Sequence, residues 1–319
     1  MRIIDDQFND AIRSVAIAGH VNPDGDCVGS TTALWQYIRK KYPDIPRVDL
    51  YLEPPKKDIC FMKGVSGAFS EVPEHAAYDL FITCDVSCLD RIGVAGELFG
   101  AAKKTVCIDH HVSNTGFAEV NYVEPDASSC AEVLFYLMED DEIDRDIAES
   151  LYTGLIHDCG VFQYRNTSPR TMRCAAALME KGIDFSSIIE ESFNSRSYLE
   201  NRVLGYLLQK AELFHGGRCI GVCVTLDELN RLGATTHETD IVVSQLRLTE
   251  GVETAVFVYE TEPGVFKASF RSNTYMDVSE ICNAFGGGGH VRAAGCTMEH
   301  CTAEEALHTL VAAVGEKLL

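Results

Sequence analysis

The chain has 319 residues, of which 46% are hydrophobic and 24% are charged, a composition typical of a folded protein large enough for two domains. Its formal net charge of −21 opposes the binding of long nucleic acid through many phosphates, so a phosphate-bearing partner should be small, with no long duplex nucleic acid. No run approaches the roughly eighteen apolar residues of a membrane span, and the N-terminus lacks a signal-peptide pattern. We therefore expect a cytoplasmic protein with no membrane partner.

The thirteen cysteines show no metal-binding or disulfide pattern. None are spaced as Cys-x-x-Cys, and the closest pairs, such as Cys84 with Cys88, are four residues apart. Several lie in apolar runs, where cysteine behaves as a small hydrophobic residue. The sequence therefore predicts reduced thiols that are mostly part of the core.

A short apolar run, residues 15–19, predicts a buried strand that leads into a polar loop. The loop contains His20, Asp24 and Asp26 around an Asn-Pro-Asp-Gly turn, and a helix can begin near Ser30. Three such side chains on one tight loop suit Mn²⁺, Mg²⁺ or Zn²⁺. A polar turn with a helix cap would explain Asp26, but not a histidine at the end of a strand.

Three further apolar runs predict strands: residues 48–52, 80–84 and 106–108. The second ends in Asp85, and the third ends in Asp109-His110-His111. Strands that alternate with helical patterns at this spacing predict a parallel sheet. Open α/β sheets carry their ligand-binding and catalytic residues at the carboxyl ends of the strands. We therefore expect the polar side chains that follow these strands to meet at one edge.

Two helical patterns follow the last of these strands, over residues 129–138 and 146–157. The second runs directly into Asp158, and Gly154 would let this helix end approach the sheet edge closely. Asp158 is therefore a candidate fourth contributor to the same site.

The pattern changes after a polar helical stretch at residues 181–197. We expect a catalytic domain over residues 1–190, a linker over 191–205 and a smaller domain over 206–319.

In the smaller domain, residues 254–259 and 266–271 alternate like paired strands joined by a Glu-Pro-Gly turn. Four glycines, Gly286–Gly289, then precede His290, Arg292 and a segment that we expect to be helical. Glycines before a helix can present backbone N–H groups to an anion. A glycine run alone could be a linker, but the histidine and arginine directly after it favour a binding loop.

The motifs, in this order along nearly the whole chain, resemble those of the DHH phosphoesterases with a C-terminal DHHA1 domain. The matching segments are His20 to Ser30, Asp85, Asp109-His110-His111, Asp158, Ser269 to Ser272, and Gly286 to His290. Length and layout are similar to the nanoRNase subgroup of short-oligonucleotide hydrolases. The resemblance implies an α/β fold: a parallel-sheet DHH domain with helices on both faces, a smaller α/β DHHA1 domain, and an active site in the cleft between them.

The resemblance also implies two divalent metal ions, usually Mn²⁺, with Mg²⁺ or Co²⁺ as alternatives. The ligands would be His20, Asp24 and Asp85 for one ion, and Asp26, Asp85, His110 and Asp158 for the other. Asp85 would bridge the two ions. Asp109 would orient a ligating histidine, and His111 would reach the substrate phosphate as hydrogen-bond donor or acid.

Residues of the DHHA1 domain would bind the substrate, with Arg271 holding a phosphate in bidentate fashion. The matching positions are Ser269, Arg271, Gly287, Gly288, Gly289, His290 and Arg292.

The implied reaction is hydrolysis of short oligonucleotides to 5′-mononucleotides, and of 3′-phosphoadenosine 5′-phosphate to AMP, by a hydroxide between the metals. The partners would be short oligonucleotides or nucleoside bisphosphates. A phosphodiesterase acting on cyclic di-AMP or linear dinucleotides needs the same residues and stays open. A family II pyrophosphatase is disfavoured by the glycine loop and Arg271, and a silent nucleotide sensor is disfavoured by the complete ligand set. The sequence leaves open whether the chain forms a homodimer.

Overall fold

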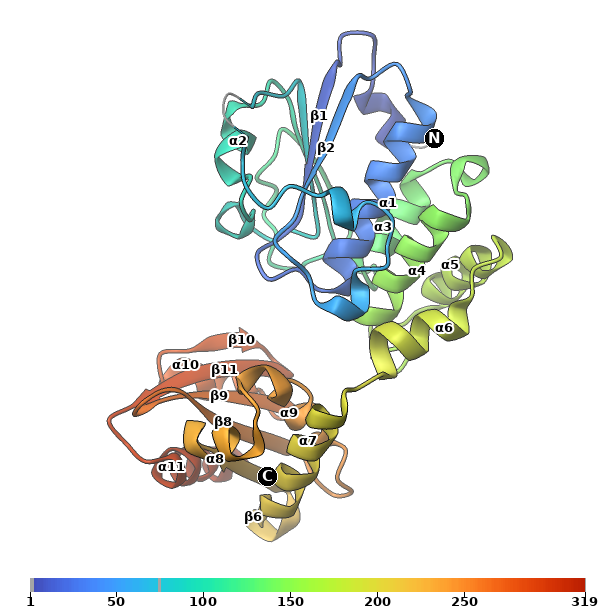
Figure 1. Cartoon of the computed structure of the whole chain (residues 1–319). Coiled ribbons are helices and arrows are strands. Elements are labelled where there is room, and N and C mark those ends of the chain that lie inside the picture. The colour runs from blue at the N-terminus through green and yellow to red at the C-terminus, as the bar shows by residue number, and fades with distance from the viewer. Residues whose placement is uncertain (1–2, 74–75, 319) are drawn as a thin grey trace. The chain divides into compact units, whose positions relative to one another are not determined.

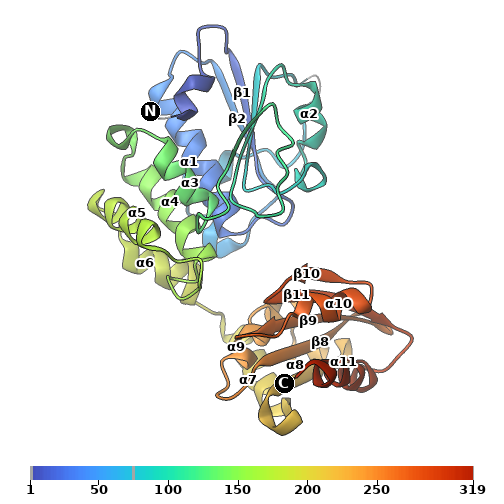
Figure 2. The same ribbon diagram turned by 180° about the vertical axis from the view of Figure 1, so that it is seen from behind.

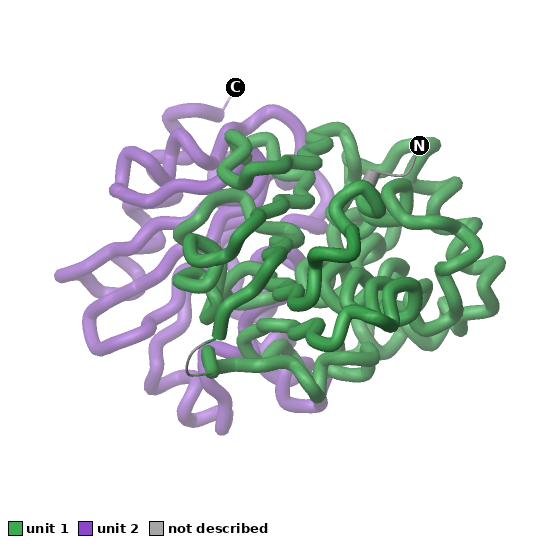
Figure 3. Tube along the Cα trace, turned by 90° about the horizontal axis from the view of Figure 1, so that it is seen from above, with its two compact units in different colours: residues 1–195 green, residues 196–319 purple. Residues whose placement is uncertain are grey.

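The computed structural model describes residues 3–73 and 76–318. The chain divides into two compact units, Met1–Ser195 and Arg196–Leu319, which are coloured separately in Figure 3. We expected a linker over residues 191–205. In the structure, a one-turn π-helix, Glu190–Asn194, is followed by three residues without helix or strand and then by α7 (Tyr198–Lys210).

The first unit is built on a five-stranded parallel sheet in the order β2-β1-β3-β4-β5, which confirms the predicted parallel α/β class. The strands are β1 (Ser14–Ala18), β2 (Arg47–Tyr51), β3 (Leu80–Cys84), β4 (Thr105–Asp109) and β5 (Val120–Val123). The sequence analysis missed β5, which is only partly buried and includes a polar Asn121, so it lacks the apolar run of the other strands.

Helices cover both faces of this sheet, as expected (Figures 1 and 2). They are α1 (Gly25–Lys41), α2 (Gly96–Ala101), α3 (Cys130–Leu137), α4 (Arg145–Asp158), α5 (Pro169–Glu180) and α6 (Phe185–Ile189). The residues of β1 alternate between the two faces, because successive side chains of a strand point in opposite directions. Val15 and Ile17 join the core beneath α1, α3 and α4, whereas Ala16 and Ala18 join the core beneath α2.

Short 3₁₀ helices complete the described elements. They are Ile3–Gln7, Lys57–Ile59, Val65–Gly67, Leu89–Arg91, Asp140–Glu142, His215–Gly217 and Thr236–Thr239.

Helix α1 begins earlier than the sequence analysis predicted. The side chain of Asp24 accepts hydrogen bonds from the backbone N–H groups of Asp26 and Cys27, both at 3.1 Å, and so caps a helix that begins at Gly25 rather than near Ser30. Asp26 therefore lies in the first helical turn instead of a loop.

The second unit has a six-stranded mixed sheet in the order β10-β11-β9-β8-β7-β6, with only β7 and β8 parallel. Its strands are β6 (Glu212–Phe214), β7 (Cys219–Val224), β8 (Thr254–Glu262), β9 (Val265–Ser272), β10 (Gly288–His290) and β11 (Ala293–Glu299). One face packs on α10 (Val278–Ala284) and α11 (Ala303–Lys317), and the other on α7, α8 (Leu226–Leu232) and α9 (Val242–Arg247). The antiparallel pairing of β8 with β9 confirms the predicted hairpin.

The segment after the glycine run is not helical, contrary to our prediction. Gly288–His290 form β10, which pairs antiparallel with β11 at the edge of the sheet (Figure 2). The glycines allow this close pairing, because a Cβ atom on Gly287 would come within 2.1 Å of the carbonyl oxygen of Gly295. On Gly289 it would come within 2.6 Å of the carbonyl oxygen of Ala293.

Two further observations agree with the composition. None of the helices in the described part of the chain combines the length and apolar character needed to cross a bilayer. Each of the thirteen cysteines is a free thiol in the structure.

Glycines on α1 and α4 let these helices pack closely against each other beneath the sheet edge. A Cβ atom on Gly29 would lie 2.5 Å from the backbone oxygen of Ser150, and one on Gly154 would lie 2.8 Å from a carboxylate oxygen of Asp26. Both distances are far below normal contact, and in each case the opposing group is held within a packed helix. The close approach of α1 and α4 therefore depends on glycine at both positions.

We predict that Gly29→Ala lowers the free energy of unfolding by about 1–3 kcal/mol, because the added methyl group forces α1 and α4 apart. Urea denaturation would measure the change. Gly100→Ala is the control in the same unit: Gly100 lies in α2 with no atom near its missing Cβ, so alanine should be neutral or stabilising there. Equal effects of the two substitutions would contradict the packing argument.

Candidate metal centre

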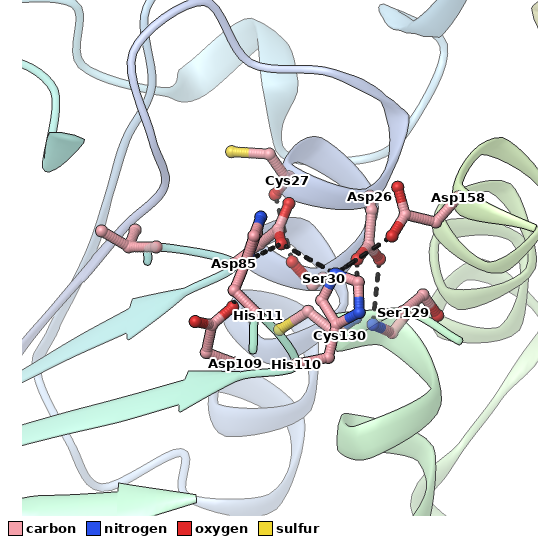
Figure 4. A network of polar contacts seen from close by, with 12 residues as sticks. Asp26, Cys27, Ser30, Asp85, Asp109, His110, His111, Ser129, Cys130 and Asp158 are labelled. Carbon is pink, nitrogen blue, oxygen red and sulfur yellow. Dashed lines mark hydrogen bonds and ion pairs between the residues drawn. The ribbon is translucent and has the colours of Figure 1, made fainter. Parts of the chain in front are cut away.

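Three neighbouring strands of the first sheet deliver polar side chains to its carboxyl edge. His20 follows β1, Asp85 follows β3, and β4 ends at Asp109 before His110 and His111. The chain places β2 on one side of β1 and the next strand, β3, on the other side. Open α/β sheets bind ligands at such a switch point. As Figure 4 shows, Asp26 from α1 and Asp158 from the end of α4 reach the same place.

The ring of His20 presents its Nε2 atom to two carboxylates. Nε2 lies 3.7 Å from Asp24 Oδ1 and 3.4 Å from Asp85 Oδ2. The other nitrogen, Nδ1, lies 2.8 Å from the carbonyl oxygen of Val21, which can only accept a hydrogen bond. A proton on Nδ1 satisfies that oxygen and leaves the Nε2 lone pair directed toward the carboxylates, as in a metal ligand.

Asp85 lies at the centre of the cluster, and its side chain is only partly satisfied. Its backbone takes a left-handed conformation with φ of 60°, which is uncommon for a residue with a side chain, and its N–H donates to the carbonyl of Ile108 at 3.0 Å. The residue is 3% exposed, yet Oδ1 has no hydrogen-bond partner among the described residues. A buried carboxylate oxygen without a partner is costly, and a cation would supply the missing interaction.

His110 connects the remaining acids of the cluster. Its Nε2 lies 3.0 Å from Asp158 Oδ2, 3.5 Å from Asp85 Oδ1 and 3.9 Å from Asp26 Oδ2. Asp26 is fully buried, and its two carboxylate oxygens accept the N–H groups of Cys130, at 2.6 Å, and Ala131, at 2.9 Å. These amides belong to the first turn of α3, where the helix dipole also favours a negative charge.

A second buried carboxylate fixes the start of α3. Oε2 of Glu132 accepts the N–H of Ser128 at 3.0 Å, the Ser128 hydroxyl at 2.5 Å and the Thr171 hydroxyl at 2.9 Å. The hydroxyl of Ser129 caps the same turn through the N–H of Glu132. These bonds hold in place the two amides that orient Asp26.

The carboxylate of Asp109 contacts the ring of His111 rather than the ring of His20 or His110. Its Oδ1 lies 2.7 Å from His111 Nδ1, and its Oδ2 accepts the side-chain N–H of Asn114 at 2.6 Å. Asp109 is completely buried, whereas the side chain of His111 is partly exposed. The pair therefore fixes the His111 ring through Nδ1 and leaves Nε2 available.

The electrostatics of the cluster favour positive charge. Burial lowers the pKa of His110, but the neighbouring carboxylates of Asp158 and Asp85 outweigh this and raise it to about 12. Burial likewise opposes protonation of His20, yet the nearby carboxylates of Asp24 and Asp85 raise its pKa. Burial and the charge of Asp85 raise the pKa of Asp26. All three shifts favour an additional positive charge, which a proton supplies here and a metal ion can supply instead.

Three groups in this cluster have ligand atoms close enough to hold one ion each. They are His20, Asp24 and Asp85; Asp26, His110 and Asp158; and Asp85, His110 and His111. Carboxylate oxygens with imidazole nitrogens suit divalent ions of the Mg²⁺ to Zn²⁺ series. The residues therefore fit a divalent metal, and the orphaned Asp85 oxygen is the observation that points to one. The six expected ligands all lie in this cluster.

The expected substrate-binding residues lie in the second unit, at one end of its sheet. Ala293 of β11 pairs with Arg271 of β9 on one side and with His290 of β10 on the other. Gly295 of β11 pairs with Ser269 of β9. Residues opposite one another or two apart share a face, so Ser269, Arg271 and His290 share one.

Two of the expected arginines also support the surrounding backbone. The guanidinium of Arg292 donates to the carbonyl oxygens of Thr274 and Met276. That of Arg271 donates to its neighbour's carbonyl at 2.9 Å. Gly287, Gly288 and Gly289 lie at or within the edge strand β10.

The sequence analysis missed two side chains next to the cluster. Asn114 holds Asp109, and a guanidinium nitrogen of Arg91 lies 3.3 Å from Nδ1 of His20. Asn114 lies only three residues after His111, which is a weak signal, and nothing in the sequence singles out Arg91.

The profile of the DHH family, N-terminal domain, matches residues 14–155, and that of the DHHA1 domain matches residues 220–318. The chain is 29% identical over 324 residues to the bifunctional oligoribonuclease and PAP phosphatase NrnA of Thermus thermophilus, covering 100% of this chain and 94% of that protein. It is 25% identical over 290 residues to the NrnA of Bacillus subtilis, covering 89% of each. The crystal structure of an exopolyphosphatase-related protein from Bacteroides fragilis has a TM-score of 0.85 to this chain at 22% sequence identity, so the two share a fold. The match covers 96% of this chain and 92% of that protein chain.

We predict that Asp109→Asn lowers the pKa of His111 in metal-free protein. The hydrogen bond to Asp109 is the main cause that raises this pKa, so loss of the carboxylate charge destabilises the imidazolium and the proton leaves at lower pH. NMR titration of the ring resonances in EDTA-treated protein measures the shift. Asp158→Asn is the matched control, because it should lower the pKa of His110 and leave that of His111 nearly unchanged. The reverse pattern would contradict the assignment.

Proposed function

The chain belongs to the DHH family and carries a C-terminal DHHA1 domain, as its motifs predicted, and on this basis we propose that it is a metal-dependent phosphoesterase of short oligonucleotides. Its products would be 5′-mononucleotides, and it would also convert 3′-phosphoadenosine 5′-phosphate to AMP. The observation that carries the proposal is the buried, partly unsatisfied Asp85, which belongs to two of the three groups whose ligand atoms lie close enough to hold an ion. The names of the Thermus and Bacillus relatives support the substrate class.

We propose that two divalent ions, Mn²⁺ in the first place, bind this edge of the sheet. His20, Asp24 and Asp85 would hold one ion, and Asp26, Asp85, His110 and Asp158 would hold the other. When bound, such ions activate a water molecule and withdraw negative charge from phosphoryl oxygens. The amides of α3 keep the buried Asp26 oriented without using all of its lone pairs, so it can both accept these bonds and ligate.

His111 is the proposed acid. Its Nδ1 contacts the buried Asp109 carboxylate, so its Nε2 can donate a hydrogen bond or a proton to the substrate. In hydrolysis to 5′-mononucleotides the 3′-oxygen of the neighbouring nucleotide leaves, and a proton from His111 would neutralise it. Asp109 would act through His111 by holding its ring and stabilising its charged form.

The second unit would bind the nucleotide. Ser269, Arg271 and His290 share one sheet face, with Arg271 as the phosphate ligand. The glycines of β10 and Arg292 would shape the edge of this subsite. A substrate of a few nucleotides needs only such local positive charge, which is compatible with a net charge of −21.

The direct test is a product time course with Mn²⁺ on four substrates: a two- to five-residue RNA, adenosine 3′,5′-bisphosphate, linear di-adenylate and cyclic di-AMP. We expect mononucleotide from the short RNA and AMP from the bisphosphate, with the cyclic compound unchanged. Because Asp85 is shared by both proposed ligand sets, EDTA or Asp85→Ala should remove nearly all turnover.

Opening of cyclic di-AMP at a comparable rate would move the protein to cyclic-dinucleotide turnover. Retention of near-normal turnover by Asp85→Ala would contradict the metal assignment. Isothermal titration with Mn²⁺ serves as a second readout, in which Asp85→Ala should bind less metal than the unchanged protein.

Arg271→Ala should chiefly raise KM for a dinucleotide, by roughly 10- to 150-fold if a charged hydrogen bond of about 1.5–3 kcal/mol is lost. The effect on kcat should be smaller, because Arg271 lies outside the metal cluster in the sequence and fold. Steady-state kinetics measures both constants. Lys267→Ala, on an exposed position of the same strand, is the control and should leave both constants unchanged.

A further inference from the structure

The segment between β9 and α10, which we call the 273–276 loop, is unusually well fixed for a surface loop. Glu253, only 6% exposed, accepts the backbone N–H groups of Thr274 at 3.1 Å, Tyr275 at 2.8 Å and Met276 at 2.8 Å. It also accepts the hydroxyl of Thr274. Three consecutive amides thus bind one buried carboxylate.

The carbonyl groups of the same loop are held from its other side. The guanidinium of Arg292 donates to the oxygens of Thr274 and Met276, and the hydroxyl of Ser272 donates to Met276 at 2.7 Å. Asn273 is fixed as well, because its side-chain N–H group donates to the carbonyls of Arg247 and Val252. These bonds leave the backbone of the loop little freedom.

This rigid loop presents one aromatic ring to solvent. Tyr275 is 42% exposed, and its hydroxyl has no hydrogen-bond partner among the described residues. Next to it runs the β10–β11 turn, where Ser272 N–H donates to the carbonyl of Arg292 and Val278 N–H to that of Val291. The ring therefore lies on a fixed support beside the turn that joins His290 to β11.

Two arginines lie beside the loop in a chain that is strongly acidic overall, and Asp277, which follows the loop, is turned toward the first turn of α10. Arg292 donates to carbonyl oxygens, and Arg247 donates to the side-chain oxygen of Asn273 at 2.9 Å. These acceptors are uncharged, and neither arginine forms an ion pair within the described residues. The nearby Glu253 is buried and turned toward the amides. An exposed aromatic ring on a loop that also contacts cationic groups is an arrangement with which proteins bind single-stranded nucleotides.

We propose that Tyr275 stacks on a nucleobase of the substrate, so that the 273–276 loop is a base subsite of the second unit. This inference rests on the proposed function and adds a base-recognition element to it. Stacking accepts any base, because every base has a flat π face, so the subsite would confer preference for nucleotides without sequence specificity. Pre-fixing the loop reduces the entropy lost when the base binds.

The test compares Tyr275→Ala and Tyr275→Phe with the unchanged protein on two dinucleotides, one with both bases and one with abasic sugars. Loss of one base stack should raise KM of Tyr275→Ala for the base-bearing substrate by roughly 5- to 150-fold, with little change in kcat. KM for the abasic substrate should stay the same. Tyr275→Phe should behave as the unchanged protein, because it keeps the ring and loses only a hydroxyl without a partner.

Tyr198→Ala is the control for loss of an exposed tyrosine, since Tyr198 is 81% exposed on α7, and it should change nothing. A Tyr275→Ala variant with equal effects on both substrates, or with none, would overturn the proposal.

A binding measurement separates this proposal from the proposed function. A dinucleotide that contains 2-aminopurine should lose fluorescence on binding the unchanged protein, and less so on binding Tyr275→Ala. If the unchanged protein hydrolyses no oligonucleotide, the proposed function fails, while the fluorescence titration still tests the subsite. If hydrolysis is normal and quenching does not depend on Tyr275, only the subsite is wrong.

Discussion

The crowding of four carboxylates at one sheet edge is the constraint on which the first unit depends. Asp24, Asp26, Asp85 and Asp158 face imidazoles and a few amides, and one oxygen of Asp85 accepts no hydrogen bond among the described residues. Two like charges 4 Å apart repel by roughly 4 kcal/mol in surroundings of intermediate polarity. Protonation of the histidines relieves part of this repulsion, and divalent ions relieve more of it. The edge is therefore stable chiefly in the presence of cations, which is what a binding site requires.

The surrounding elements hold this unfavourable arrangement in place. Helices α1 and α4 approach closely enough to bring Asp26 and Asp158 together because Gly29 and Gly154 leave room. Helix α3 contributes the amides that orient Asp26, and Glu132 fixes the turn from which they point. The positive φ of Asp85 fits the same picture, because strained backbone persists where the surrounding structure determines it.

Local patterns explain why much of the site could be predicted from the sequence. A buried parallel strand is a run of apolar residues, so the first polar residue after it must lie at the sheet edge, and this placed His20, Asp85 and Asp109. What failed depended on particular side-chain and backbone contacts that the hydrophobic pattern does not encode. Because Asp24 caps α1, the helix begins at Gly25, about one turn earlier than the expected start near Ser30. The close approach of Gly287 and Gly289 to β11 gives a strand where we expected a helix. Asn114 reaches Asp109 from a loop whose path no local pattern encodes.

Buried carboxylates in the two units differ in how many hydrogen bonds their oxygens accept. This difference distinguishes a carboxylate that fixes the backbone from one that can bind a metal ion. Glu253 binds three backbone amides and a hydroxyl, so its charge is fully used in fixing a loop. Asp85 receives no comparable donors, although it is just as buried. Asp26 lies between these cases, with one amide on each oxygen and His110 on its open side. Because each carboxylate oxygen can accept more than one bond, Asp26 can support and ligate at once, whereas Asp85 is left to ligate alone. Burial and an unused oxygen do not identify a metal ligand by themselves, because Oε1 of the buried Glu132 also accepts no hydrogen bond among the described residues. That oxygen faces the guanidinium of Arg170 at 3.4 Å, whereas Asp85 faces imidazoles and lies among further carboxylates.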